Sequence, residues 1–422
     1  MSRTDGISVV SGLAMALALG ACAATTPAPT GTAVSTSAPT SGASGAGAAV
    51  GAPAAPGAGT TSAGSASAGS ASSGGASGAA GASGGEHGGH GGGAPEPIPP
   101  AELLPQEVHL KNLQQLSFSG ENAEAYFSFD GKRLSFQSKR DGAACDRIYS
   151  MNIDGSDVQQ ISSGQGVTTC SYYTPDGKSV IYASTHLAGP DCPPKADMSL
   201  GYVWDVYASF DIFKKDLATG TITRLTDAPG YDAEATISPD GKTIVFTSAR
   251  DGDLELYAMD LDGKNQRRLT HTPGYDGGAF FSHDSKKLVW RASRPQGDAL
   301  VEFQTLLKDA KVRPTQLEIY VGNADGSNAQ QLTNNGAANF APYFLPDDSG
   351  VVFVSNVNDP RKRNFDIYSV KLDGSAMTQL TFSPVFDGFP MFSRDGKKLV
   401  FASNRGGKVR GDTNVFIADW VP

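Results

Sequence analysis

Residues 230–247 read GYDAEATISPDGKTIVFT, and the fold prediction begins from this stretch. Ser-Pro-Asp-Gly is a tight-turn signature, because Gly adopts the positive φ that primed hairpin turns require. The turn separates a run that ends at Ile237 from the alternating residues 243–247, which predict a half-buried strand. The stretch therefore predicts a β-hairpin whose first strand begins with an acidic residue, Asp232.

The same hairpin recurs along the chain. Related phrases are FSFDGK at 127–132, YTPDGK at 173–178, FSHDSK at 281–286, FLPDDS at 344–349 and FSRDGK at 392–397. After each of the first five hairpins comes a second turn, either Asp-Gly or Thr-Gly. Two hairpins make one four-stranded sheet, and such a sheet buries both faces when copies of it stack around an axis. The sequence thus predicts an all-β, six-bladed β-propeller with four-stranded antiparallel blades.

The two ends of the chain are expected to close the ring together. The last repeat stops at its third strand, residues 414–420, whereas residues 108–117 resemble an isolated fourth strand. An N-terminal strand that completes blade six leaves no exposed sheet edge, which a non-closing solenoid would have.

The first hundred residues are dominated by Gly, Ala, Ser, Thr and Pro, a composition that cannot bury a core. An apolar run from Ile7 to Leu19 is typical of an export signal, and LGAC at 19–22 resembles a bacterial lipobox. We therefore predict a lipoprotein signal peptide at 1–21, a lipidated Cys22 that begins a disordered low-complexity linker over 22–104, and the propeller over 105–422. An ordinary secretory signal is the alternative. The lipid is the expected membrane attachment.

The repeat resembles the TolB-like, WD-like propeller repeat over residues 108–422, through ISPDGK at 237–242, RDG at 250–252, LYAM at 256–259 and RLT at 268–270. This resemblance implies a monomeric propeller with a binding or scaffold role in the cell envelope. The protein would be anchored at the outer membrane, in the periplasm or on the cell surface, with an envelope protein or polysaccharide as its partner. The net charge of −9 and the absence of a basic run argue against nucleic acid.

A polar column precedes the turns. The residues eight positions before the first-turn Asp are Asn122, Thr168, Asp232, Asp276, Asn339 and Asp387, and Glu124 and Glu234 follow two positions later. These residues start the innermost strands, so we expect them at the channel mouth on the side opposite the turns, called the loop face.

Two interpretations of this column remain open. The side chains either cap backbone N–H groups or bind a ligand. Asp232 and Asp276 would suit a divalent cation such as Ca²⁺, which takes oxygen ligands. The predicted ligand-binding set is His186, Tyr231, Asp232, Glu234, Tyr275, Asp276, Asn339 and Asp387.

Blades two and four carry about twenty extra residues in one loop each, and loops of that length are often functional. Residues 298–313 show apolar residues at helical spacing, which predicts a helix that begins with Asp298 as its N-cap and stops at Pro314. Both inserts should lie on the loop face, beside Asp232 of blade three.

Cys145, Cys170 and Cys192 should also lie on the loop face, and an exported protein permits a disulfide. We predict the pair Cys145–Cys170, because these positions are adjacent across the boundary between blades one and two.

The sequence favours a protein that binds a protein or envelope polymer through its loop face. One alternative is a carbohydrate- or peptide-active enzyme with a metal at the channel mouth. Another is the accessory domain of a separate peptidase. No catalytic residue is predicted.

Overall fold

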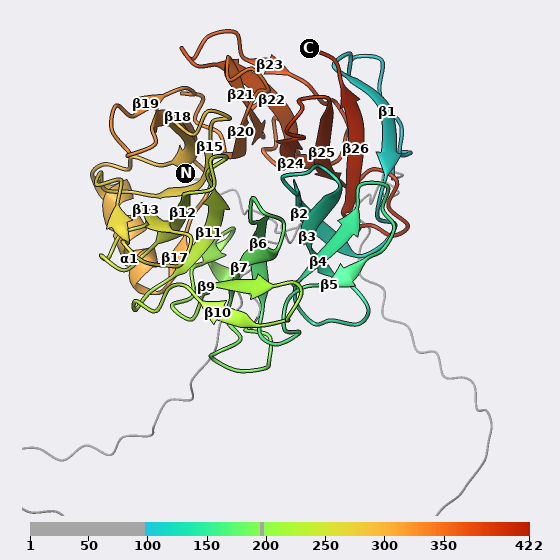
Figure 1. Ribbon diagram of the computed structural model, residues 1–422. Coiled ribbons are helices and arrows are strands. Elements are labelled where there is room, and N and C mark those ends of the chain that lie inside the picture. Colours follow the sequence, from blue (N-terminus) through green and yellow to red (C-terminus); the bar gives the residue numbers. More distant parts are fainter. Residues whose placement is uncertain (1–97, 195–197) are drawn as a thin grey trace, which may run out of the picture. The chain divides into compact units, whose positions relative to one another are not determined.

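The computed structural model describes residues 98–194 and 198–422, so the predicted signal peptide, Cys22 and nearly all of the linker lie outside the described residues. Six four-stranded antiparallel sheets are arranged around a central axis (Figure 1). The innermost strands of neighbouring blades contact one another. The predicted six-bladed propeller is confirmed.

The blades follow the chain in order. They are β2 (Glu121–Phe127), β3 (Arg133–Lys139), β4 (Arg147–Asn152) and β5 (Gln159–Gln160) in blade one; β6 (Thr168–Tyr173), β7 (Ser179–Ser184), β9 (Asp211–Asp216) and β10 (Ile222–Arg224) in blade two; β11 (Asp232–Ile237), β12 (Thr243–Ser248), β13 (Glu255–Asp260) and β14 (Arg267–Arg268) in blade three; β15 (Asp276–Phe281), β16 (Lys287–Ala292), β18 (Glu318–Asn323) and β19 (Gln330–Gln331) in blade four; β20 (Asn339–Phe344), β21 (Gly350–Ser355), β22 (Asp366–Lys371) and β23 (Thr378–Gln379) in blade five; and β24 (Asp387–Phe392), β25 (Lys398–Ser403) and β26 (Asn414–Trp420) in blade six.

The N-terminal strand β1 (Leu110–Gln115) completes blade six by pairing antiparallel with β26, as predicted (Figure 1). A buried ion pair joins the same two ends of the chain. The Arg405 guanidinium donates to both carboxylate oxygens of Glu107, at 2.9 and 3.1 Å, and to Asp387 Oδ2 at 2.5 Å. The ring is therefore closed by both a strand and a charge cluster.

The recurrent turn motif has a direct structural reason. In blade three the Ser238 hydroxyl donates to the Asp240 carboxylate at 2.7 Å, and the carboxylate also accepts the Lys242 N–H at 3.2 Å. The same hydroxyl accepts the Thr243 N–H at 3.0 Å. Gly241 takes a φ of 72°, the left-handed conformation that glycine tolerates best. The motif thus satisfies its own polar groups at an exposed turn.

Each innermost strand contains a β-bulge six residues before its turn Asp. The register shifts there in all six blades, and the bulged residue has a positive φ. These residues are Glu124, Cys170, Glu234, Gly278, Ala341 and Phe389. Bulges re-aim side chains and occur beside functional sites.

The two long inserts join each other. The blade-two insert contains η1 (Met198–Leu200) and β8 (Trp204–Asp205), and the blade-four insert contains α1 (Asp298–Lys308) and β17 (Lys311–Val312). Strands β8 and β17 pair antiparallel. The N-cap of α1 is Gly297 rather than the predicted Asp298, which is the first helical residue, and the helix ends before Pro314.

The predicted disulfide is wrong. Cys145 is bonded to Cys192, and Cys170 is buried without a disulfide partner among the described residues. Cys170 occupies the bulge of β6, where its Sγ lies 3.3 Å from Thr169 Oγ1. The disulfide links the β3–β4 loop of blade one to the blade-two insert.

Candidate functional site

The polar column at the starts of the innermost strands is buried inside the blades. All six of its side chains belong to residues that are 0% exposed. In five blades the strand partner of the column residue is a serine, as in the pair Asp232–Ser248. The column therefore forms part of the internal structure of each blade instead of an open channel mouth.

Each aspartate of the column has an arginine in its own blade. Arg250 donates to both oxygens of Asp232, at 2.9 and 3.0 Å, and Arg294 donates to Asp276 at 2.6 and 2.9 Å. Burial raises the pKa of Asp276 to about 7, while Arg294 acts in the opposite direction. Such a pair neutralises its own charge, so neither carboxylate needs a metal as counter-ion.

The remaining column residues of the predicted set are bonded locally in the same way. The Asn339 side-chain amide donates to the Leu317 carbonyl at 2.7 Å, and Asp387 accepts from Arg405. The structure does not bring Asp232, Asp276, Asn339 and Asp387 together around one point. Within the described residues there is no group of three or more His, Cys, Asp or Glu side chains placed to hold a metal ion.

A different set of side chains meets near the axis, called here the axial cluster: Glu124, Cys170, Glu234, Tyr275 and Arg291. The Glu234 carboxylate accepts from the Arg291 guanidinium, from the Tyr275 hydroxyl at 3.1 Å and from Thr247 Oγ1 at 2.7 Å. Arg291 also donates to the Tyr275 hydroxyl at 2.7 Å. Gly278 makes room for this guanidinium, because a Cβ there would lie 2.2 Å from Arg291 Nη1.

Glu124 is the least satisfied member of the axial cluster. The residue is 3% exposed, and its Oε2 has no hydrogen-bond partner among the described residues. Burial raises its pKa to about 8, against the effect of a hydrogen bond with Cys170. The carboxyl group is therefore protonated at neutral pH. The neighbouring Glu234 side chain raises the pKa of Glu124 further.

The joined inserts cover this cluster. Trp204 of β8 lies 5.2 Å from the Arg291 guanidinium, 6.3 Å from the Tyr275 ring and 6.2 Å from the Phe340 ring of blade five. Trp204 is 7% exposed and packs with Phe303 of α1 and with Val312 of β17. The inserts lie beside blade three, as expected, and they pack against the axial cluster as a cover.

The opposite side of the cluster is closed by aromatic rings. The Tyr126 ring of blade one lies 5.5 Å from the Phe280 ring of blade four, and Phe280 lies 5.3 Å from Tyr343 of blade five. Contacts between such distant blades show that side chains fill the axis at this level. The axial cluster is therefore enclosed between the aromatic layer and Trp204.

The other two predicted ligand-binding residues lie at the edge of this arrangement. Tyr231 packs edge-on against Phe210, with ring centroids 5.7 Å apart, and is partly buried. The His186 Nδ1 is 2.8 Å from Ser184 Oγ, and its ring lies 4.2 Å from Phe213. Burial lowers the pKa of His186.

Sequence reasoning identified Glu234 and Tyr275 but missed Arg291 and Trp204. Arg291 lies in an ordinary alternating strand, so its inward direction follows from the bulge opposite it in β15. Trp204 lies in an insert with no repeat to align it. Gly278, where the other five blades carry a side chain, was the available signal for a close neighbour.

Comparisons with known proteins agree with this fold. Residues 189–313 match the family model described as the TolB beta propeller domain. A TolB homolog of Chlorobium chlorochromatii is 26% identical over 159 residues, which are 32% of this chain and 36% of that protein. Residues 189–313 thus resemble the TolB β-propeller domain, in agreement with the six-bladed propeller of the described residues.

Other similar proteins are more diverse. Dipeptidyl-peptidase 5 of Porphyromonas endodontalis is 38% identical over 81 residues, 19% of this chain and 10% of that enzyme. The solved structure of a TolB-like protein from Agrobacterium tumefaciens covers 72% of this chain and 91% of its own, at 20% identity and a TM-score of 0.49. The matched parts of the curated relatives are thus less than half of their lengths.

Proposed function

We propose that this TolB-type propeller is a binding scaffold of the cell envelope, and that it binds a protein partner through the joined inserts on its loop face. The observation that carries the proposal is the β8–β17 pair, which fuses inserts from two blades into one surface. The family match over residues 189–313 spans both inserts and blade three between them.

The exposed side of this surface supports binding. Leu187, Leu200 and Val301 are 58%, 42% and 62% exposed, and all three belong to the inserts. Exposed apolar side chains that cluster on one part of a surface mark interaction sites. Glu124 and Glu234 of the axial cluster lie beneath Trp204, an arrangement that favours a structural role for them over catalysis.

The cellular location is part of the same proposal. Cys22 is proposed to carry a lipid and residues 22–104 to act as a tether, so that the loop-face surface meets an envelope partner. The mass of the mature N-terminus, measured on protein from its native host, checks this: an unmodified N-terminus would contradict it. Among the described residues, no helix has the length and apolarity needed to cross a membrane.

Site-specific photo-cross-linking in the native host tests the binding surface. A photoreactive residue at Val301 should cross-link to a discrete protein, and the same residue at Asp262, an exposed turn on the opposite face, should not. A second substitution, Leu200→Asp, should reduce the Val301 cross-link. Equal products from the two positions, or none at Val301, would contradict a protein-binding loop face.

A further inference from the structure

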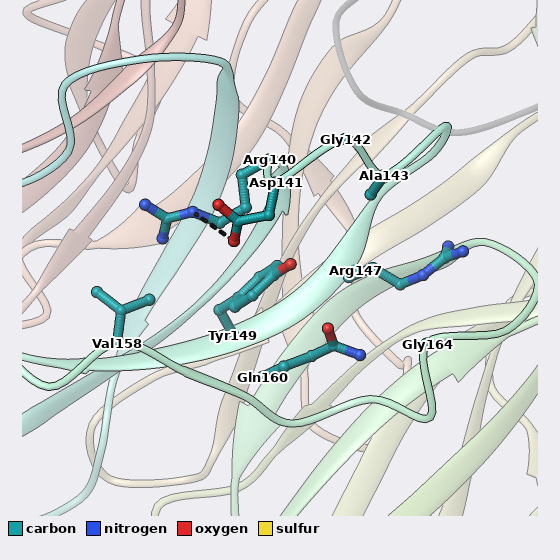
Figure 2. A pocket seen from close by; sticks show the side chains of 9 residues that line it. All are labelled: Arg140, Asp141, Gly142, Ala143, Arg147, Tyr149, Val158, Gln160 and Gly164. Carbon is teal, nitrogen blue, oxygen red and sulfur yellow. Dashed lines mark ion pairs between the residues drawn. The ribbon is translucent and has the colours of Figure 1, made fainter. Parts of the chain in front are cut away.

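A second feature of the loop face lies away from the joined inserts, at the outer part of blade one. It is a pocket of about 570 Å³ whose lining includes Arg140, Arg147, Tyr149, Val158 and Gln160 (Figure 2). We call it the arginine pocket. Its volume falls within the range of ordinary ligand sites.

The two arginines of this pocket lack the strong counter-ions that the other blades provide. Arg140 has an ion pair only with the neighbouring Asp141, at 3.8 Å, and the Asp141 side chain is 81% exposed. The Nε and Nη1 atoms of Arg140 are buried and have no hydrogen-bond partner among the described residues. Arg147 forms no ion pair with any described carboxylate, and its Nη1 donates to the backbone carbonyls of Asp146 and Gly166. Exposed ion pairs contribute little, so the positive charge of the pocket has no strong counter-ion among the described residues.

The repeat explains why Arg140 is unpaired. The equivalent arginines of blades three and four, Arg250 and Arg294, bind the column aspartates of their blades. In blade one the column residue is Asn122, whose amide donates to the carbonyl groups of Ser119 and Thr413. The Arg140 guanidinium instead lies 5.4 Å from the Tyr149 ring.

Tyr149 is the centre of the pocket. Figure 2 shows its ring between the two arginine side chains, with Gln160 nearby. Burial raises the pKa of the Tyr149 hydroxyl, Asp141 raises it further, and both arginines lower it. The pocket thus combines two guanidinium groups, a hydroxyl and an amide in a protein of net charge −9.

The pocket is also next to an unpaired sheet edge. Strand β5 is the outermost strand of blade one and pairs only with β4. Val158 and Gln160, two residues apart at this edge, both line the pocket, and Val158 is 40% exposed. An extended segment that pairs with an exposed edge gains main-chain hydrogen bonds, while a neighbouring pocket selects its side chain.

From this geometry we propose that the arginine pocket binds the carboxylate of an acidic side chain, carried by an extended segment of a partner protein that lies along β5. Arginine matches a carboxylate with two parallel hydrogen bonds, which lysine cannot reproduce. The proposal is separate from the binding role of the inserts and does not rest on it.

The disulfide holds this pocket in shape. Cys145 lies in the same β3–β4 loop as Arg140 and Asp141, and it is bonded to Cys192 of the blade-two insert. Arg147 Nη1 lies 3.0 Å from Cys145 Sγ. We expect reduction of this bond to weaken binding in the pocket, because the loop loses its attachment.

Binding of short peptides to the full chain tests the proposal. The probe is fluorescently labelled acetyl-Thr-Val-Glu-Val-Thr-amide, and its matched control has Gln in place of Glu. Wild-type protein should bind the Glu peptide about tenfold more tightly, the size expected for one charge-assisted contact of about 1.4 kcal/mol. Raising the salt concentration should reduce this preference.

Substitutions test whether the preference for the Glu peptide arises in the arginine pocket. Arg140→Gln should remove most of the preference for Glu, Arg140→Lys should keep part of it, and Arg267→Gln, an exposed arginine on the outer strand of blade three, should leave it unchanged. The Val301 and Leu200 variants should also leave it unchanged.

Several results would overturn the inference. Equal binding of the two peptides would do so, as would no binding of either at millimolar concentration. Binding of galacturonate without binding of the Glu peptide would assign the pocket to an acidic sugar. The comparison of two peptides on unmodified protein keeps the test valid even if Arg140→Gln does not fold.

Discussion

Asp232 and Asp240 lie in the same segment of blade three, one at each end of the innermost strand, yet their environments are opposite. Asp240 is in an exposed turn, and its pKa is lowered first by the Ser238 hydroxyl. Asp232 is 0% exposed, and burial raises its pKa despite the neighbouring Ser248 and Arg250. One residue type therefore serves two purposes, set by solvent access and by its partners.

The same contrast recurs in blade four, where the pKa of Asp284 at the turn is lowered to about 2 and that of Asp276 in the column is raised to about 7. The turn aspartates organise local hydrogen bonds in water. The buried aspartates require a counter-ion from the fold, because an isolated buried charge is costly. The turn aspartates and the buried aspartates should therefore respond very differently to mutation and to pH.

The largest effect is expected where a buried pair is broken. Arg405→Met removes the only cation bonded to both Glu107 and Asp387 among the described residues, and all three side chains are at most 1% exposed. Loss of one partner from a buried ion pair costs about 3–5 kcal/mol. Urea denaturation should show a lower free energy of unfolding by about that amount.

The matched control is Lys397→Met, which removes an exposed pair with Asp395 at 3.7 Å in the same blade. It should leave the unfolding midpoint almost unchanged. Equal destabilisation by the two variants would mean that the buried cluster of Arg405, Glu107 and Asp387 stabilises the fold no more than an exposed ion pair does.

An intermediate effect is expected from Glu124, and it depends on pH. The folded-state pKa is about 8, against an ordinary value of 4.5. The folded protein therefore keeps a proton that the unfolded chain releases, so stability falls as pH rises from 4.5 towards 8. The slope is at most about 1.4 kcal/mol per pH unit.

Glu124→Gln removes this contribution, and the variant should gain stability relative to wild type as pH is raised from 5 to 8. Denaturation at both pH values measures the difference. Glu121→Gln, on the same strand but beside the partly exposed Lys139, should show no such trend. A constant difference between Glu124→Gln and wild type would show that Glu124 is ionised throughout.

The smallest effect is expected at the turns. Asp240→Asn keeps an acceptor for the Ser238 hydroxyl and the Lys242 N–H, and solvent screens the lost charge. The free energy of unfolding should change by less than about 1 kcal/mol. Thermal denaturation of Asp240→Asn and Asp232→Asn, side by side, measures the difference directly. A larger loss of stability in Asp240→Asn than in Asp232→Asn would contradict the expected order.

Much of the fold was predictable because the turn motif satisfies its own hydrogen bonds. Ser238, Asp240 and Gly241 act within six residues, so the sequence carries the full signal wherever the motif recurs. The strand that closes blade six was predictable for a related reason, since a propeller with one strand missing leaves an unpaired edge. The pairing of Cys145 with Cys192 was not predictable, because it depends on where a long insert folds.

The sequence by itself determined the strands of the blades, the number of blades and their order, because hairpin turns and strand alternation are local properties. Only the tertiary structure decided which side chains meet at the axis. A bulge at positive φ re-aims Glu124, Cys170 and Glu234, and inserts distant in the sequence bring Trp204 over Arg291. GYDAEATISPDG thus specifies its own hairpin, but the role of Asp232 as a buried partner of Arg250 exists only in the folded blade.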